Sequence, residues 1–457
     1  MKLANHSILV SCIFIVAIMM LPPLWNIPHT ILLRHLCGLT LLVVVLMSRP
    51  NWKDFFYCNK ALILLFLYLI IQLIFFSTDH IAAFRNFKSE WLKFILFALT
   101  GIGCGFILSR KKLWYFNLYA GCLFSIPIFI HLGLSLFKGI STGEIPARYW
   151  GINETHGDLG YTSIHAVVFL SVYLLFQAKS TLHKLLVSLI LIACVLSLLI
   201  AGSRAGILFL ILTFCFVLVI RIFHAKQSSF SYKRVALLFI GILFLIFSIF
   251  QVGSFINPQR WNLNTPKFEI AFKGDAIKIN CEGIGVLEKI IEQEGTEFTP
   301  QIQSTLDSIN GFDGARIVAL RSALQLIYNH PMGINQSRLA YDIALEKSCG
   351  GKPKIELLNS HNGWADTALG IGVIGALLYF LVLCNFMYTG ISVLKHKDPM
   401  IVVTGIALLS LGFIWLLRSM FDSAQRDQML EMQIFTICIL SAIIFFKQQL
   451  RSNTVTH

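Results

Sequence analysis

Apolar residues recur along the chain in long blocks, and a short polar or basic segment ends each block. Twelve of these blocks approach the length of about 20 residues that a helix needs to cross a bilayer. One polar interruption, from Gly253 to Asn362, is far longer than the others. The pattern predicts an all-α polytopic membrane protein with twelve spans, at approximately residues 7–24, 30–48, 61–77, 91–108, 114–137, 161–177, 185–202, 205–222, 235–252, 363–390, 400–417 and 430–446.

The long polar segment divides the chain into three parts: residues 1–252 with nine spans, residues 253–362, and residues 363–457 with three spans and a tail. Local periodicity in the middle part favours a mainly helical cap that packs back against the membrane face. The clearest of its helices stops at His330-Pro331, because a residue before proline resists helical geometry. Four helices are expected there, at residues 284–294, 299–309, 314–329 and about 336–347.

Composition supports the membrane assignment. Apolar residues make up 56% of the chain, charged residues make up 13%, and the mean hydropathy is +0.74. A soluble domain is about half apolar and about a quarter charged. The composition therefore excludes a soluble globular protein.

The net charge of +14 could indicate a nucleic-acid partner, but its distribution indicates membrane orientation instead. Basic residues gather in the segments on one side of the predicted spans, where Asp54 and Asp398 are the only acids. Such an excess marks the cytoplasmic side, so both termini are expected in the cytoplasm. The first apolar block lacks an Ala-x-Ala cleavage site and contains Pro22-Pro23, so we interpret it as a retained span. The opposite face then receives the long polar segment and the loops 21–29, 78–90, 138–160 and 418–429.

Most of the eleven cysteines lie inside predicted spans, where they behave as small apolar residues. Cys281 and Cys349 alone fall in the long polar segment. In an oxidising compartment they could form a disulfide that closes a loop of roughly 70 residues, worth about 4 kcal/mol in the chain-entropy model. The alternative is a pair of free buried thiols.

Arg204 lies in the segment Ala201-Gly202-Ser203-Arg204-Ala205-Gly206, which joins two spans almost without a turn. Because arginine is costly in lipid, it should face a protein cavity or water there. Its guanidinium group can bind a phosphate through two hydrogen bonds. From position alone, an interfacial arginine that reaches to water is the more common alternative.

Two arginines of the middle part are further candidates for binding an anion. On the predicted helix 314–329, Arg316 lies on the buried stripe, whose apolar members are Leu320, Ala323 and Ile327. Arg321 points away from that stripe. A buried guanidinium needs an anionic partner, either a carboxylate or a ligand, although a residue in the first turn could also reach water. Arg338, on the next helix, is a weaker candidate of the same kind.

His361 stands at the junction between the long polar segment and the span that follows it. A histidine can accept a proton from a hydroxyl group near neutral pH, so it suits a general base. Its position near the membrane surface is accessible to a group linked to a lipid. A lone histidine is more often a hydrogen-bonded structural residue, however. Asp366 could orient the imidazole, and Asn362 could position a substrate or cap the helix.

Several motifs are absent from the sequence. It has no Gly-x-x-x-x-Gly-Lys-[Ser/Thr] loop, no His-Glu-x-x-His and no Cys-x-x-Cys, and the outer segments have no Asp-x-Asp pair. Nucleotide hydrolysis, a metal site and other cofactors are therefore not expected. The predicted spans also lack the several acidic residues of a proton-coupled transporter.

These residues occur in the order seen in the O-antigen ligase and polymerase superfamily, which the chain resembles. One matching segment is Gly202-Ser203-Arg204-Ala205-Gly206. The other runs from Gly314-Ala315-Arg316 through His330-Pro331 and Ser337-Arg338 to His361-Asn362, Asp366 and Gly370-Ile371-Gly372-Val373-Ile374-Gly375. One large loop before three terminal spans is more similar to the ligase branch than to the polymerases. The chain departs from the family at Asp366, where glutamate is common, and at Leu320, where many relatives carry an aromatic residue.

The resemblance implies a glycosyltransferase of the bacterial inner membrane whose active site faces the periplasm. Such an enzyme moves a glycan from undecaprenyl diphosphate to a sugar hydroxyl of lipid A–core during lipopolysaccharide assembly. Arg204 and Arg316 match family arginines thought to hold the diphosphate, Arg338 is a further candidate, and His361 matches the proposed catalytic histidine. Direct attack by the acceptor hydroxyl predicts inversion at the anomeric carbon, and the arginines would stabilise the leaving diphosphate without a metal.

Alternative functions remain within and outside the superfamily. An O-antigen polymerase would use another carrier-linked repeat unit as the acceptor, and a protein-glycosylating relative would use a protein. From a different class, the chain could be a transporter or flippase that binds lipid-linked glycan without cutting it. A cap on one face counts against a transporter, because cargo needs access from both sides.

Overall fold

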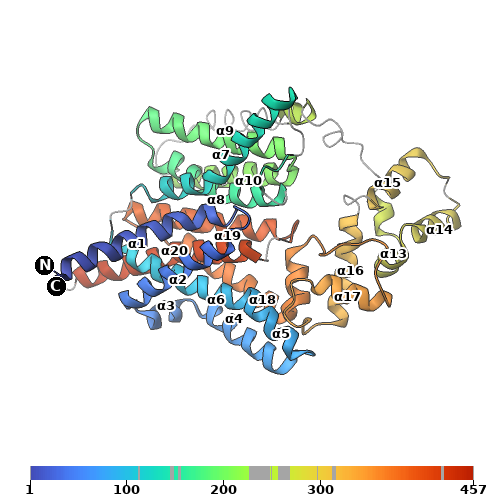
Figure 1. The fold of residues 1–457 in the computed structure, drawn as a ribbon, viewed down its shortest axis with the longest axis horizontal. Helices are drawn as coiled ribbons and strands as arrows, with labels where there is room; N and C mark the ends of the chain where they lie inside the picture. Colours follow the sequence, from blue (N-terminus) through green and yellow to red (C-terminus); the bar gives the residue numbers. More distant parts are fainter. Residues whose placement is uncertain are drawn as a thin grey trace.

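The computed structural model describes residues 2–111, 114–144, 149–152, 156–225, 247–248, 250–255, 268–295, 297–310, 315–423 and 427–455. Helices are the only regular secondary structure in this described part, so the predicted all-α class is confirmed. The long helices form a bundle, and a smaller group of short helices projects from one end of it (Figure 1). This smaller group, the described residues between Phe268 and Asn362, is called the cap below. Helix α1 begins and helix α20 ends at the end of the bundle away from the cap.

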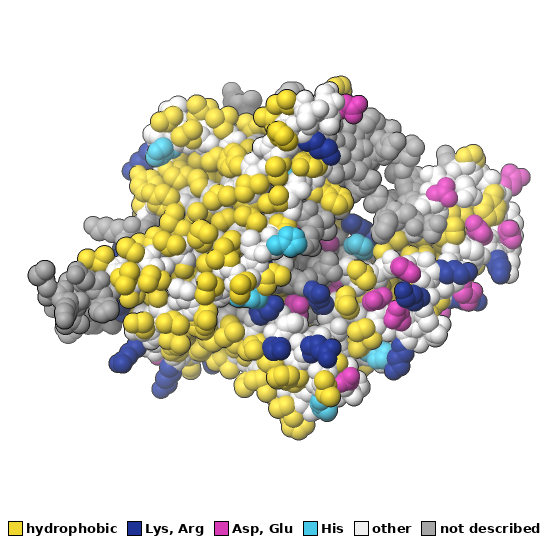
Figure 2. All heavy atoms as spheres, in the orientation of Figure 1, with side chains coloured by type: hydrophobic (Ala, Val, Ile, Leu, Met, Phe, Trp, Pro, Cys, Tyr) yellow, Lys and Arg dark blue, Asp and Glu magenta, His cyan; other side chains and the backbone are white. Residues whose placement is uncertain are grey.

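The bundle contains two groups of helices (Figure 1). The first group consists of α7 (Phe116–Thr142), α8 (His156–Val172), α9 (Thr181–Ala201) and α10 (Arg204–Ala225), with a π-helical end η3 (Tyr173–Gln177) after α8. The second group consists of α1 (Lys2–Leu24), α2 (Ile31–Ser48), α3 (Trp52–Cys58), α4 (Lys60–Ile71), η1 (Gln72–Phe76), α5 (His80–Asn86), η2 (Phe87–Trp91), α6 (Leu92–Ser109), α18 (Gly363–Ser392), α19 (Pro399–Arg418) and α20 (Asp427–Val455). Hydrophobic side chains cover most of the bundle, whereas acidic side chains gather over the cap (Figure 2).

Nine helical segments of the described residues are long and apolar enough to cross a membrane. A tenth results if the pair Trp52–Cys58 and Lys60–Phe76, bent by 94°, counts as one span. The chain is therefore a multi-pass membrane protein. Of the twelve predicted spans, the first corresponds to the shorter apolar helix Ile8–Leu24, and the ninth, 235–252, lies mostly outside the described residues. The count of twelve therefore stays a prediction.

Glycines allow α6 and α20 to pack closely at the centre of the bundle. A Cβ atom on Gly101 would lie 2.6 Å from the carbonyl oxygen of Phe435, and one on Gly105 would lie 2.6 Å from that of Ile439. These distances leave no room for a side chain. Small residues four positions apart commonly bring membrane helices together in this way.

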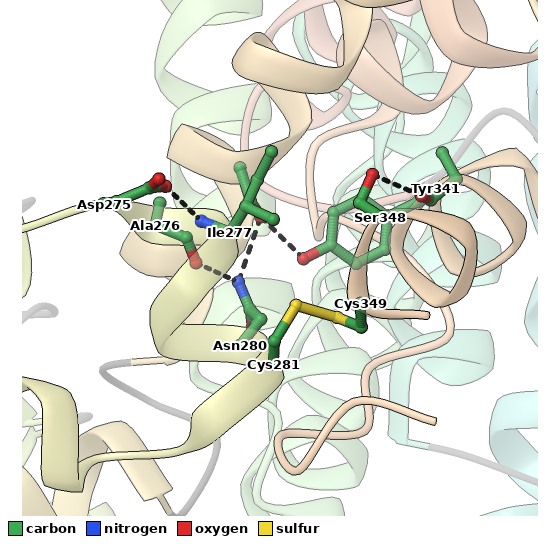
Figure 3. Close-up of a disulfide and its surroundings, with 10 residues drawn as sticks. Asp275, Ala276, Ile277, Asn280, Cys281, Tyr341, Ser348 and Cys349 are labelled. Atoms are coloured by element: carbon green, nitrogen blue, oxygen red, sulfur yellow. Dashed lines mark hydrogen bonds between the residues drawn. A yellow bond between two sulfur atoms is a disulfide. The ribbon is translucent and has the colours of Figure 1, made fainter. Parts of the chain in front are cut away.

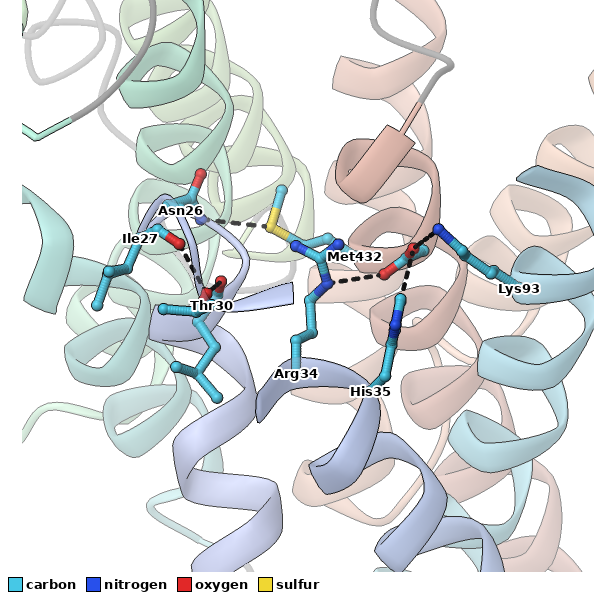
Figure 4. Close-up of polar contacts among 9 residues, drawn as sticks. Asn26, Ile27, Thr30, Arg34, His35, Lys93 and Met432 are labelled. Carbon is cyan, nitrogen blue, oxygen red and sulfur yellow. Dashed lines mark hydrogen bonds and ion pairs between the residues drawn. The ribbon is translucent and has the colours of Figure 1, made fainter. Parts of the chain in front are cut away.

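A buried ionic cluster joins α2, α6 and α20 near the cap end of the bundle. Arg34, His35 and Lys93 all approach the carboxylate of Glu431, with nitrogen–oxygen distances of 3.1, 3.7 and 3.8 Å (Figure 4). Only 3% of the Glu431 side chain is exposed. We call these four residues the Glu431 cluster. A buried carboxylate persists in a membrane protein when it is paired, so the cluster neutralises a charge that the bundle encloses.

The cap has its own hydrophobic core, which continues into the first turns of α18 through Ala365 and Leu369. Its helices are η4 (Phe268–Phe272), α13 (Ala276–Glu282), α14 (Gly285–Gln293), α15 (Pro300–Asn310), α16 (Ala315–Asn329) and α17 (Ala340–Cys349). Three of these match the predicted helices 284–294, 299–309 and 314–329, although Gly314 itself lies outside the described residues. Helix α13 was not predicted.

A disulfide and a buried polar network hold α13, α16 and α17 together (Figure 3). Cys281 and Cys349 form the disulfide, with Cα atoms 5.3 Å apart, which is one of the two alternatives that the sequence left open. The Asn280 amide donates to the Ser322 hydroxyl at 3.1 Å, and this hydroxyl lies 2.8 Å from that of Tyr341. Burial raises the pKa of the Tyr341 phenol, so it stays neutral and can share a hydrogen bond. The cap is therefore braced covalently and by hydrogen bonds.

The predicted helix at 336–347 begins late, at Ala340, because the preceding residues form a wedge in the bundle. Asn335 and Gln336 both have positive φ angles, of 50° and 54°, which end helical geometry there. The Gln336 side chain donates to the carbonyl oxygen of Leu69 at 2.7 Å. The Asn335 side chain accepts hydrogen bonds from the backbone amides of Thr78 and Asp79. We call residues 331–337 the wedge.

The wedge pairs with a break in α18. Gly372 has φ 83° and interrupts the helix, and Gly333, with φ 84°, packs directly against its backbone. The amide of Ile334 donates to the carbonyl oxygen of Leu369 at 2.7 Å, and the amide of Val373 donates to that of Pro331 at 2.9 Å. The backbone groups freed by the break are thus satisfied by the wedge. The first turns of α18 are in this way fixed to the cap.

Candidate functional site

His361 lies in a sharp turn that precedes α18. Its φ angle is 55°, and its backbone amide donates to the Asn359 side chain at 3.1 Å. The next residue, Asn362, caps α18 by accepting from the amide of Ala365 at 2.9 Å, and its amide group donates to the carbonyl oxygen of Met420. The turn therefore holds His361, half-buried, at a fixed place on the helix end.

The segment that follows α19 packs against this turn. The amide of Gly363 donates to the carbonyl oxygen of Ser419 at 2.7 Å and to that of Asp422 at 3.1 Å. Asp366 joins the two segments, because it accepts from the backbone amide of Ser360 at 2.9 Å and from the hydroxyl of Ser423. Asp366 thus ties the turn that carries His361 to the segment after α19.

Asp422 is the carboxylate of this site. Burial alone would raise its pKa, but the charge of Arg418, whose Nη2 lies 3.5 Å away, and a hydrogen bond from Tyr161 lower it instead. The charges of Arg316 and His361 lower the pKa of Asp422 further, so both side chains lie near this carboxylate. About a quarter of the Asp422 side chain, 26%, remains exposed. We call these five residues the Asp422 cluster.

Arg418 is almost completely enclosed, with 1% of its side chain exposed. Its guanidinium carbon lies 4.1 Å from the centre of the Tyr161 ring, and a Cβ atom on Gly160 would lie 3.0 Å from Nη2. A side chain at Gly160 would therefore compete with the arginine for space. The Nε and Nη1 atoms of Arg418 have no hydrogen-bond partner among the described residues. This arrangement fixes the guanidinium beneath Asp422 and holds the carboxylate in its ionised form.

The two arginines of α16 behave differently. Arg321 donates to the carbonyl oxygens of Ala271 at 2.8 Å and Lys273 at 3.2 Å, and also to that of Gly274. It therefore supports the fold of the cap. Arg316 lies near Asp422, and its buried Nε has no hydrogen-bond partner among the described residues. Its guanidinium is thus able to contact an anion that enters the site.

Arg204 begins α10 directly after the turn at Gly202, which has φ 69°. Five residues further along the helix, Phe209 packs against Phe421, with ring centres 6.0 Å apart, and beneath Arg418 at 5.4 Å. Five helical residues span about 7.5 Å. The start of α10 therefore lies on the same side of the bundle as the Asp422 cluster.

Arg338 faces a separate pocket with an empty volume of about 440 Å³. Its Nη1 lies 3.9 Å from Glu90. The lining residues are Glu90, Trp91, Gln336, Ser337, Arg338, Gly363, Asp366, Thr367, Gly370, Ser423 and Leu430. Arg316 is not among the residues that line this pocket.

Taken together, Arg316 and His361 both act by their charge on Asp422, Asn362 caps α18 after the His361 turn, and Asp366 in the first turn of α18 supports that turn. Sequence reasoning missed Asp422, Arg418 and Tyr161. Arg418 and Asp422 carried a usable signal, since opposite charges four residues apart at the end of an apolar span share one helix face. Within the described residues, no three His, Cys, Asp or Glu side chains group as metal ligands would.

A known protein family matches part of the chain. Residues 188–380 match a family described as O-antigen ligase, and this match supports membership of the O-antigen ligase superfamily. The matched region contains Arg204, Arg316, Arg338 and His361, whereas Asp422 lies beyond it. No curated protein matches the chain.

Proposed function

We propose that this member of the O-antigen ligase superfamily is a glycosyltransferase that moves an O-antigen glycan from undecaprenyl diphosphate to a sugar hydroxyl of lipid A–core. The observation that supports the proposal is the Asp422 cluster, in which the carboxylate lies 3.5 Å from Arg418 and the charges of Arg316 and His361 act on it as well. A proton acceptor and a phosphate-binding cation are the two groups that this reaction needs.

In the proposed reaction, His361 takes the proton of the acceptor hydroxyl as its oxygen attacks the anomeric carbon. The imidazole becomes positively charged in this step, and the negative charge of Asp422 stabilises that form. The bond between the anomeric carbon and the diphosphate breaks on the opposite side. The product is therefore inverted at that carbon.

Negative charge builds up on the departing diphosphate in the same step. Arg316, with its unpartnered Nε, and Arg204, at the start of α10, would stabilise this charge, with Arg338 as a further candidate. The donor already carries its leaving group, so no nucleotide is needed. The guanidinium groups take the role that a metal ion has in many other glycosyl transfers.

The cellular location follows from the same reasoning. A disulfide in the cap is typical of an oxidising compartment such as the periplasm. The cap lies at the end of the bundle opposite the beginning of α1 and the end of α20 (Figure 1). We therefore propose the bacterial inner membrane, with the site facing the periplasm and both termini in the cytoplasm.

The decisive experiment is an in vitro reaction with the purified full-length protein, carrier-linked glycan and lipopolysaccharide that lacks O-antigen. Glycan should appear on the lipopolysaccharide, with inverted configuration at the transferred sugar. Growth of glycan on the carrier alone would favour a polymerase and contradict the proposal. Binding of the donor with neither product would favour a transporter.

Replacing the catalytic histidine, His361→Ala, should lower transfer about 10²- to 10⁴-fold, as expected for loss of a general base. Initial rates under saturating donor and acceptor would measure this. His80→Ala is the matched control, because His80 is an exposed histidine on α5 outside the Asp422 cluster. Equal rates in the two variants would remove His361 from the mechanism.

A further inference from the structure

A groove opens between α2 and α6 on the surface of the bundle, with an empty volume of about 760 Å³. Its walls are mostly apolar, and Leu39 and Leu96 are exposed along it. Three basic side chains stand at its cap end: His35, Lys88 and Lys93. The groove is therefore apolar along its length, as an acyl chain requires, and basic at its cap end. We call this basic end, formed by His35, Lys88 and Lys93, the mouth of the groove.

The charge at this mouth is positive even after the Glu431 cluster is taken into account. Glu431 is the carboxylate that Lys93 approaches, and Arg34 lies closer to it, at 3.1 Å against 3.8 Å (Figure 4). The arginine therefore already balances the carboxylate. Lys93, about a third exposed, and Lys88, which is exposed, retain positive charge for an anion. An anionic lipid headgroup complements this mouth.

The groove and the Arg338 pocket share a wall. Lys88 and Lys93 face the groove, while Glu90 and Trp91, between them in sequence, line the pocket beside Asp366. Residues two or three positions apart point to different faces of a helix, so η2 and the start of α6 separate the groove from the pocket. A lipid held in the groove would consequently have its headgroup at η2, across from the Arg338 pocket.

The reaction proposed above joins two substrates that are both anchored in the membrane. The donor diphosphate is assigned to Arg316 and Arg204, on the α10 and α16 side of the Asp422 cluster. The acceptor therefore needs a second approach from the bilayer, and the groove between α2 and α6 lies across η2 from the Arg338 pocket, which Gly363 and Asp366 line.

We propose that this groove binds the lipid A anchor of the acceptor, with one acyl chain between α2 and α6 and a phosphate at Lys88 and Lys93. The assignment rests on the proposed function for the identity of the acceptor. The expectation of a phosphate next to an acyl chain rests on the groove alone, which is apolar along its length and basic at one end.

The bundle offers a matched control groove between α7 and α9. Its empty volume is about 880 Å³, and it is also mostly apolar. Its described lining residues include His183 but neither lysine nor arginine. Leu189 in this control groove and Leu39 in the proposed groove are similarly exposed, at 52% and 59%.

The test is equilibrium binding of lipids to the purified full-length protein, followed by native mass spectrometry. The ligands are diphosphoryl lipid A, lipid A without phosphates, and phosphatidylglycerol. We expect the Lys88→Gln/Lys93→Gln variant to bind diphosphoryl lipid A about a hundredfold more weakly, because it loses two charge-assisted phosphate contacts of about tenfold each. Its binding of lipid A without phosphates should not change. Leu39→Trp should also weaken binding, whereas Leu189→Trp should not.

Equal affinity of the wild-type protein and the double glutamine variant for diphosphoryl lipid A would overturn the assignment. Equal affinity of the wild-type protein for phosphatidylglycerol and lipid A would also overturn it, because the groove would then hold an ordinary bilayer lipid. If the wild-type protein transfers glycan but the variants bind lipid A as the wild type does, the assignment of the groove is refuted and the proposed function is not. If lipid A binds as expected but the wild-type protein transfers no glycan, the proposed function is refuted and the groove remains a lipid A binding site.

Discussion

Two carboxylates at the cap end of the bundle are each surrounded by cations, but they differ in enclosure. Glu431 faces Arg34, His35 and Lys93 and is 3% exposed. Asp422 faces Arg418, Arg316 and His361 and is 26% exposed. The first carboxylate is enclosed between helices of the bundle, whereas the second lies where the bundle meets the cap.

The difference shows how similar charge sets can serve separate purposes. An enclosed carboxylate such as Glu431 holds the basic side chains around it in place. It leaves no space for a ligand between them. A partly exposed carboxylate such as Asp422 leaves room for a substrate beside Arg316 and His361. The buried Arg418 meanwhile keeps this carboxylate ionised. We therefore expect substitutions of the enclosed residues Glu431 and Arg34 to act on stability, and those in the Asp422 cluster to act on turnover.

The largest effect is expected for Glu431→Gln, which leaves Arg34 buried without a counter-charge. Breaking such a pair costs about 3–5 kcal/mol, measured by denaturant unfolding in detergent micelles. The double variant Arg34→Met/Glu431→Leu should recover most of this loss, because apolar replacements remove both buried charges. A stable double variant with no transfer activity would show that the Glu431 cluster takes part in function.

Arg316→Ala should lower the transfer rate about a hundredfold, the typical cost of removing one electrostatic partner of a developing negative charge. Stability should change little, because Nε of Arg316 has no hydrogen-bond partner among the described residues. Initial rates and donor affinity would be measured together. Arg321→Ala is the control on the same helix, and it should weaken the cap while keeping turnover per folded molecule. A similar rate loss in both variants would mean that Arg316 acts through the fold of the cap.

Asp422→Asn should lower the rate about tenfold, since a neutral amide no longer stabilises the charged imidazole. The pKa of Asp422 lies below its usual 3.8, so its contribution to stability is present above that value and is lost only as the pH falls through the lower, folded-state pKa. The carboxylate therefore does not titrate between about pH 5 and pH 9. An acid limb of the wild-type pH–rate profile in that range would belong to His361, and in Asp422→Asn it should move to lower pH. An unmoved limb would separate Asp422 from His361.

The smallest effect is expected for Lys93→Gln. Lys93 is about a third exposed and lies 3.8 Å from Glu431, so their pairing should contribute less than about 1 kcal/mol. Denaturant unfolding of Lys93→Gln and Glu431→Gln under the same conditions would compare their losses in free energy of unfolding. A loss as large as that of Glu431→Gln would show that Lys93, and not Arg34, balances the buried carboxylate.

Sequence periodicity predicted the helical membrane body and most of the cap helices, because both depend on local patterns. It was wrong about the start of α17, since Asn335 and Gln336 take positive φ angles to bond with residues near position 70. No local signal encodes such a distant partner. The disulfide stayed open for the same reason, because spacing in sequence does not fix the 5.3 Å between the Cα atoms of Cys281 and Cys349.

The candidate site was predictable in part. Arg316 and His361 stood out because a cation or a base at a membrane edge is unusual, and the structure brings both to Asp422. Asp422 itself was overlooked in a segment interpreted as a connecting loop. Tyr161 had no signal at all, since a tyrosine within an apolar span is indistinguishable from a core residue until its neighbours are known.

The break at Gly372 separates α18 into a short part of nine residues next to the cap and a longer part that continues through the bundle. Bilayers of different thickness tilt a spanning helix, and an unbroken helix would swing its tip sideways with every change of tilt. Here the wedge is bonded to the short part through Leu369 and to the start of the long part through Val373, so the joint itself is fixed to the cap. We expect catalysis to tolerate thin and thick membranes alike. A Cβ atom at Gly372 would lie 2.8 Å from the backbone of Met332, so Gly372→Ala should disrupt the joint and remove that tolerance.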